Sequence, residues 1–156
     1  MSQLSKAARM SWNIGAAEAA RARHPFIERE HVAVGLCSLL KILDYLNYTH
    51  VETLPADSIR EEGEEIERAL VAQGITGVAF RRGVRSRLRP GNTVHTEKAV
   101  HRSPECKRHF YRAREIAGAG ADVRVRDLMA AILEDPGPIV NSVLAGAGIA
   151  PDALRR

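Results

Sequence analysis

Residues 18–36 read EAARARHPFIEREHVAVGL. This stretch contains the end of one expected helix and the start of the next. Proline removes a backbone donor and disfavours a helical residue before it, so His24-Pro25 ends the first helix. From Glu28 onward apolar residues return at helical spacing. A helix, a short break and a second helix are therefore expected here, and the same periodicity extends in both directions.

Helices account for the rest of the first half. Ser5 is a good N-cap residue, and the apolar positions after it predict a helix over residues 5–23. Downstream, the periodicity predicts one long helix over residues 28–48. Pro55 introduces a third helix over residues 57–74, with most of its glutamates facing outward.

The pattern begins again in the second half. Ser103-Pro104 combines an N-cap hydroxyl with a proline in the first turn, and it opens a helix that Gly118 breaks. Further helices are expected over residues 125–134 and 139–147, and a final turn begins at Pro151. The expected fold is therefore all-α, with two pseudo-symmetric helical repeats packed as one compact domain over residues 1–156.

The segment between the repeats is unusually basic. We place repeat 1 at residues 4–75, an Arg-rich linker at 76–100 and repeat 2 at 101–156. Between Thr76 and Asn92 there are five arginines and no acid, whereas the other 18 basic residues nearly balance 19 acidic ones. A solvated, mobile linker is expected, which could alternatively contact the acidic stretch 61–67. Binding of nucleic-acid phosphates is less favoured, because Phe80 is the only aromatic residue there.

Composition restricts the other classes. A chain of 156 residues can bury a core without disulfides, and Cys37 and Cys106 stand among helix-forming residues, which favours a reducing cytoplasm. The longest apolar run is too short for a membrane span, so no membrane partner is expected. Cys106 and His109 share a helix face, but two ligands are too few for structural zinc, and Cys37 is expected to be a buried, inert thiol. We expect no metal and no cofactor.

Ordered motifs in both halves resemble one known family. Residues 18–36 are similar to the repeat of the Clp N-terminal (Clp R) domain, in which a helix ending in Glu-Ala-Arg leads to Gly-Thr-Glu-His and Leu-Leu-x-Gly-Leu. Residues 103–107 resemble the Thr-Pro-x-Ala-Lys helix start of that family, and residues 134–149 resemble its tail. The chain departs from the pattern where Gly-Thr is replaced by Glu28-Arg29 in the first repeat and by Arg124-Val125 in the second.

The resemblance implies a non-catalytic domain that recruits substrates or adaptors to a Clp-type AAA+ unfoldase or chaperone. The expected partners are unfolded or tagged proteins, adaptor proteins and the AAA+ ring, in the same chain or another. The chain has no Gly-x-x-x-x-Gly-Lys-Ser/Thr loop, so ATP hydrolysis is not expected here. The alternatives are a stand-alone regulator that competes for adaptors or ligands and, less favoured, a nucleic-acid-binding helical protein. An enzyme is not expected.

Residues that could bind a protein segment gather where the repeats should meet. Apolar contacts could come from Phe26, Ile27, Phe80 and Val123, and orientation from charged or polar side chains. The complete candidate set is Phe26, Ile27, Glu30, His31, Phe80, Val123 and Arg126. A simpler interpretation of Glu30 and His31 is that both stand in the first turn of a helix, where a carboxylate favours the helix dipole.

In some Clp relatives the Glu of each Gly-Thr-Glu-His binds phosphoarginine. The matching residues are Glu30 and Arg126. Because Arg126 would repel the guanidinium portion of such a ligand, two-site phosphoarginine binding is not expected.

Overall fold

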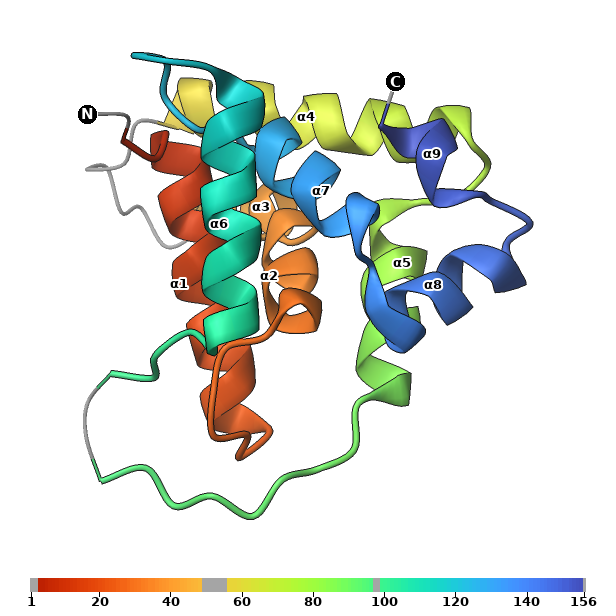
Figure 1. Ribbon diagram of the computed structural model, residues 1–156. Helices are drawn as coiled ribbons and strands as arrows, with labels where there is room; N and C mark the ends of the chain where they lie inside the picture. The colour runs from red at the N-terminus through yellow and green to blue at the C-terminus, as the bar shows by residue number, and fades with distance from the viewer. Residues whose placement is uncertain (1–2, 49–55, 97–98, 156) are drawn as a thin grey trace.

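The computed structural model describes residues 3–48, 56–96 and 99–155 (Figure 1). In these residues the regular elements are α-helices, so the expected all-α class is confirmed. None of the helices in the described part is long and apolar enough to cross a membrane. Pro55, expected before the third helix, lies outside the described residues. The helices are α1 (Lys6–Arg21), α2 (Arg29–Leu36), α3 (Leu39–Tyr48), α4 (Ala56–Ala72), α5 (Gly77–Arg87), α6 (Pro104–Ala117), α7 (Val125–Glu134), α8 (Gly137–Gly146) and α9 (Pro151–Leu154).

Two isolated parallel bridges relate the repeats by a pseudo-two-fold axis. Leu4, just before α1, pairs with Val123, just before α7, and Ile27, just before α2, pairs with Arg102, just before α6. Each bridge therefore joins the start of one repeat to the start of the second helix of the other repeat. The halves contact each other through equivalent positions, as a duplicated unit should. The exact repeat boundaries stay predictions.

Hydroxyl caps begin the first helix of each repeat. Ser5 accepts a hydrogen bond from Ala8 N–H at 3.1 Å, and Ser103 accepts one from Cys106 N–H at 3.0 Å. Each bond satisfies a backbone donor that would otherwise have no partner in the helix. Both expected helix starts are confirmed.

The second helix of each repeat begins without a hydroxyl N-cap, since Glu28 and Arg124 occupy the N-cap positions. At α2, Glu28 N–H donates to His31 Nδ1 at 2.9 Å, and at α7, Arg124 N–H donates to Asp127 Oδ2 at 2.8 Å. In both cases a side chain three residues on accepts the bond, as in one half of a capping box. His31 and Asp127 are thus equivalent structural residues.

Backbone contact sets the spacing of α1 and α2. A Cβ at Gly35 would lie 2.1 Å from the carbonyl oxygen of Ser11, so a side chain at residue 35 would push the helices apart. Both helices contact α7 from the second repeat, which places the core between the two halves.

The prediction of a single helix over residues 28–48 is wrong. The chain leaves α2 at Cys37, where Ser38 Oγ donates to Val34 O at 2.6 Å, and resumes as α3 in a new direction. The turn allows α3 to pack against α4, with Leu39 and Leu43 buried. Burial of these leucines favours the turn over a straight helix.

The prediction of a solvated linker from residue 76 is also wrong. Thr76 caps α5 by accepting from Ala79 N–H at 3.0 Å, and Phe80 and Val84 are fully buried. These apolar residues, one helical turn apart, anchor the segment to the core, and its arginines occupy the remaining faces. Arg81 is the exception among them, since it is 4% exposed and donates to Cys37 O at 3.3 Å, at the end of α2.

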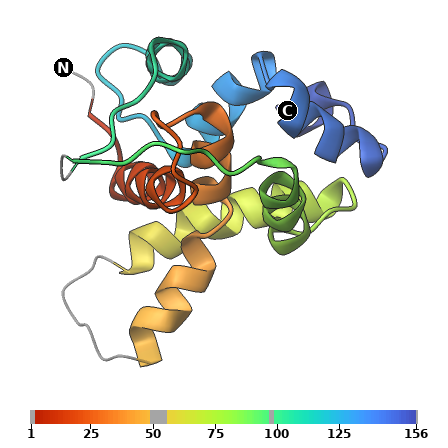
Figure 2. The same cartoon turned by 90° about the horizontal axis from the view of Figure 1, so that it is seen from below.

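The chain is extended only beyond α5, where it crosses the end of α1 (Figure 2). Gly91 N–H donates to Ala22 O at 2.7 Å, and Thr93 N–H donates to Arg23 O at 3.0 Å. A Cβ at Gly91 would lie 2.1 Å from Arg23 O, so this close approach requires glycine. The part of the segment that crosses α1 is tied to it by backbone bonds.

The Arg-rich segment contacts the acidic stretch of α4 through its backbone, since Gly77 N–H donates to Glu67 Oε2 at 3.0 Å, and not through an arginine ion pair among the described residues. Arg85 instead pairs with Glu18 of α1. The carboxylate of Glu65 on α4 lies near Arg124 and Arg126 of the second repeat, at 3.7 and 4.0 Å. These ion pairs join α4 to the start of α7, and Arg60 joins α4 to α3 through Asp44 at 3.7 Å.

Candidate functional site

Two equivalent junctions join the repeats. The first junction lies at the start of α2 and faces α6, and the second junction lies at the start of α7 and faces α1 and α4. Glu30 in the first and Arg126 in the second occupy matching helix positions.

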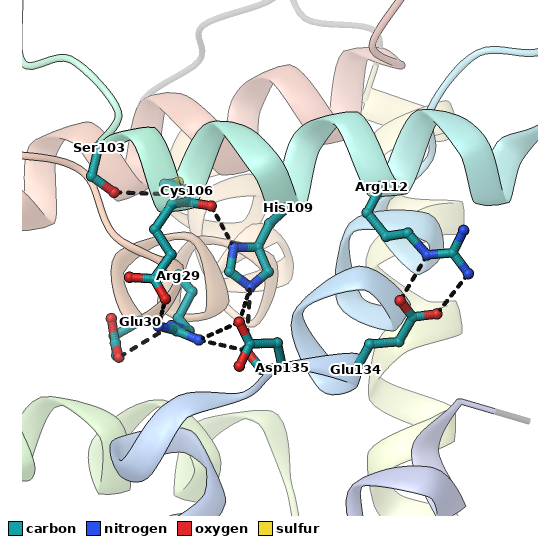
Figure 3. Close-up of polar contacts among 9 residues, drawn as sticks. Arg29, Glu30, Ser103, Cys106, His109, Arg112, Glu134 and Asp135 are labelled. Carbon is teal, nitrogen blue, oxygen red and sulfur yellow. Dashed lines mark hydrogen bonds and ion pairs between the residues drawn. The ribbon is translucent and has the colours of Figure 1, made fainter.

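The first junction is filled by Arg29, whose side chain is 12% exposed (Figure 3). Its guanidinium contacts Glu105 Oε1 at 2.5 Å, Asp135 O at 2.7 Å and Asp135 Oδ2 at 3.1 Å, and it lies 3.8 Å from Glu30 Oε1. The group packs against Gly137, where a Cβ would meet Arg29 Cζ at 3.1 Å. Arg29 thus engages the carboxylates that face this junction.

Polar groups around Arg29 are also engaged. The two ring nitrogens of His109 lie 2.9 Å from Glu105 O and 3.2 Å from Asp135 O (Figure 3). Burial raises the pKa of the Cys106 thiol to about 12, so it is protonated at neutral pH. No group of three or more potential metal ligands occurs in the described ranges.

Burial also shifts the pKa values of the two candidate residues at the start of α2. It raises the pKa of Glu30, against the lowering effect of its own backbone hydrogen bond and of Arg29. It lowers the pKa of His31 to about 4, and the neighbouring His24 adds to this effect. His31 is 1% exposed and is therefore neutral at physiological pH.

Cys37, after α2, is not poised as a nucleophile. Burial raises the pKa of its thiol to about 12. A protonated thiol is a poor nucleophile.

The second junction contains a buried carboxylate, whereas the first is filled by the Arg29 side chain. Glu62 on α4 is 7% exposed, and its Oε1 accepts from Ser5 Oγ–H at 3.0 Å and from Val125 N–H at 2.8 Å. Arg124 Nε lies 3.9 Å from the same oxygen. Glu62 thus joins α1, α4 and α7. Arg126 points outward, with 61% of its side chain exposed.

A continuous groove opens beside this carboxylate. Two hollows of about 390 and 380 Å³ meet there, since both are lined by Ile116, Arg126 and Asp127. We call it the inter-repeat groove because α4 forms one wall and α6, α7 and α9 form the others. The remaining lining residues are Glu65, Ile66, Ala69, Leu70, Met129, Ala130, Leu154 and Arg155 on one side, and Ser5, Glu62, Ala117, Ala121, Asp122 and Arg124 on the other.

The groove combines an apolar floor with a charged rim. Ile66, Leu70 and Met129 contribute apolar floor on the α9 side. Arg126 on the rim lies 4.0 Å from Glu65, and Arg155 pairs with Glu134 outside the groove. An apolar cleft with a few polar groups at its edge suits side chains of an extended protein segment.

A larger hollow of about 710 Å³ lies on the outer face of α1. It is lined by residues of the first repeat, joined only by Asp122 from the second. It borders the second junction, since Ser5 and Asp122 line both this hollow and the inter-repeat groove, but it contains none of the candidate residues from the sequence.

The structure places the seven candidate residues in four different environments. Four are core residues at 0–2% exposure, namely Ile27, His31, Phe80 and Val123. Glu30 lines the filled first junction, and Phe26 is 45% exposed in the loop before α2. Only Arg126 lies in the inter-repeat groove. The sequence motifs did not indicate the groove residues of α4 as binding residues. Ile66 and Leu70 are one turn apart on α4, so an apolar stripe on this helix is visible in the sequence.

The architecture is that of a Clp N-like helical domain. The N-terminal domain of Hsp104 from Candida albicans has the same fold, with a TM-score of 0.68 and 12% sequence identity over 98% of this chain and 87% of that chain. No protein-family model and no curated protein sequence matches the chain. The structural likeness extends over nearly the whole length, as the motif resemblance did.

Proposed function

We propose that this chain is a non-catalytic binding domain that receives protein segments in the inter-repeat groove and recruits them to a Clp-type AAA+ unfoldase or chaperone. The observation that supports this most strongly is the asymmetry of the junctions. The first is closed by Arg29, whereas the second is an open cleft with an apolar floor. The Hsp104 N-terminal domain, whose fold is the same, adds support from fold analogy alone.

The ligands would be unfolded or tagged proteins, or an adaptor that carries them. A peptide backbone could bond to Arg126 and Arg155 while apolar side chains enter the groove. The free thiols of Cys37 and Cys106 fit a reducing compartment, and we infer a cytoplasmic setting from them.

Phosphoarginine is not the ligand that we expect. Arg29 already pairs with the carboxylates of the first junction. At the matching position of the second junction, Arg126 carries the same positive charge as the guanidinium of such a ligand. A tag of this kind would meet a filled site and a repulsive one.

The groove can be blocked without disturbing the core. Ala69 and Ala130 line it and are partly exposed, so a tryptophan at either residue would occupy the cleft. We expect Ala69→Trp and Ala130→Trp each to weaken binding of a reduced, carboxymethylated model protein by about tenfold or more, because the apolar floor is then covered. Fluorescence anisotropy with the labelled unfolded protein measures this.

Ala145→Trp supplies the matched control, because Ala145 is exposed on α8 away from the groove. It should bind like the wild type. Equal binding by all four proteins, or no binding by the wild type, would contradict the proposal. Circular dichroism establishes that each variant is folded.

A further inference from the structure

We propose that the end of α1, the arginines along α5 and the chain up to Arg89 form a second docking surface, which binds acidic protein segments. We call it the arginine face and define it by Arg21, Arg23, Arg82, Arg85 and Arg89. It lies outside the inter-repeat groove and requires no property of that groove.

The face is strongly and almost uniformly positive. Residues 19–27 and 76–96 contain no Asp or Glu. The nearby Glu18 is 8% exposed and lies beneath two of the arginines, bonded to Arg85 and 3.6 Å from Arg21. The other three arginines of the face are exposed and have no carboxylate within ion-pair distance among the described residues. The basic charge is therefore available to a partner.

Fixed contacts hold the two helix ends together. Glu18 joins α1 to Arg85 of α5, and His24 Nε2 lies 2.5 Å from Arg89 O. Backbone bonds tie the chain beyond Arg89 to the end of α1, as described above. The guanidinium groups thus stand on an ordered platform, so a ligand need not order a flexible linker.

Arg23 gives an independent indication. Its φ is 61°, in the left-handed region where glycine is favoured, just after the end of α1. In the described residues it is the one non-glycine residue with positive φ. An arginine with this backbone conformation is less favourable for folding than a glycine. Residues held in such unfavourable conformations are often found at functional sites. Binding of an anion is a reason to keep arginine there.

An acidic protein segment fits this face better than a nucleic acid does. Single-stranded nucleic acids bind along a basic groove with several stacking aromatic residues, whereas Phe26 is the one exposed aromatic residue in the two stretches. Outside the five arginines of the face, the other 18 basic residues of the sequence nearly balance its 19 acidic ones. Guanidinium groups bind carboxylates through paired hydrogen bonds, so a short run of Glu or Asp matches the patch.

Anisotropy titrations with a fluorescein-labelled peptide of alternating Glu and Ser test the proposal. The wild type should bind it with an affinity that falls as salt is added, and should not bind the matching Lys-Ser peptide. Arg82→Glu combined with Arg89→Glu should weaken binding by about tenfold or more. Arg23→Gly should weaken binding while raising the melting temperature by about 2–4 °C.

Lys107→Glu combined with Arg108→Glu is the matched control, because it changes the net charge equally on the exposed face of α6. It should leave the affinity unchanged, as should Ala130→Trp in the inter-repeat groove. The proposal is overturned if the α6 control weakens binding as much as the arginine variants, if an oligouridylate of equal length binds more tightly than the acidic peptide, or if the acidic peptide does not bind.

Discussion

Replacing Glu62 by alanine is expected to lower the free energy of unfolding by about 3 kcal/mol. Its buried Oε1 accepts from the Ser5 hydroxyl and from Val125 N–H, and it lies near Arg124 Nε. Removing it leaves the Val125 N–H without its acceptor and takes one carboxylate away from the Arg124 guanidinium, at the point where α1, α4 and α7 meet. Urea denaturation followed by circular dichroism measures the change.

Two further variants of α4 make this result specific. Glu64 is exposed on the same helix, so Glu64→Ala should change stability by no more than about 0.5 kcal/mol. Glu62→Gln keeps an oxygen that can accept both hydrogen bonds, and it should retain most of the stability. If Glu62→Ala is as stable as Glu64→Ala, Glu62 does not join the repeats as we describe.

Stability is expected to fall as the pH is lowered from about 6.5 toward 4, by on the order of 3 kcal/mol from His31. The folded pKa of His31 is about 4, against 6.5 for the ordinary group, chiefly because the ring is buried. Between these values the unfolded chain binds a proton that the folded chain does not, so acidification favours unfolding. Below the folded pKa no further loss is expected from this group.

The hydrogen bonds around His31 show why the ring is neutral. Its Nδ1 accepts from Glu28 N–H, so the proton of the neutral ring is on Nε2, which lies 2.7 Å from His24 Nδ1. His24 can then donate from Nε2 to Arg89 O. A proton added to His31 Nδ1 would break the bond that begins α2.

The pH prediction is best measured as a difference between proteins. Glu30 has the opposite effect on stability. Because its pKa is raised in the folded chain, the folded chain binds this proton more readily than the unfolded chain, and lowering the pH favours folding through this group. His31→Asn keeps an acceptor for Glu28 N–H and removes the titrating ring, so its stability should depend less on pH than that of the wild type. A His31 ring that titrates near 6.5 by NMR, or identical pH profiles for both proteins, would refute the prediction.

The two proposed surfaces give this small domain separate ways to bind protein. The inter-repeat groove offers apolar area, which suits an unfolded segment and depends little on salt. The arginine face offers charge, which suits a folded or flexible acidic partner and is screened by salt. The salt dependence of each variant therefore distinguishes which surface a newly found partner uses.

Local signals in the sequence were enough for the architecture. Ser5 and Ser103 cap helices, His24-Pro25 ends one, and the apolar periodicity places most of the others, because these effects act within one or two turns of chain. The motif resemblance led to the same Clp N-like fold that the structure has. The all-α class and the duplicated order of helices could be predicted in this way.

Local signals failed where composition outweighed pattern. The five arginines favoured the prediction of a linker over residues 76–100. The spacing of Phe80 and Val84 and the N-cap residue Thr76 indicate a helix instead. At Cys37 the periodicity continued through a turn, because α2 and α3 present the same kinds of residues to different neighbours. The turn at Cys37 depends on packing, because α3 lies against α4 and local periodicity does not specify that contact.

The sequence by itself determined that this protein is all-helical, built from two related units and near neutral outside one arginine-rich segment. Only the tertiary structure decided that Ile27, His31, Phe80 and Val123 are core residues, that Arg29 closes one junction, and that the equivalent junction stays open beside Arg126. The physical reason is that caps and periodicity act along the chain, whereas burial and charge pairing depend on residues brought together from distant segments.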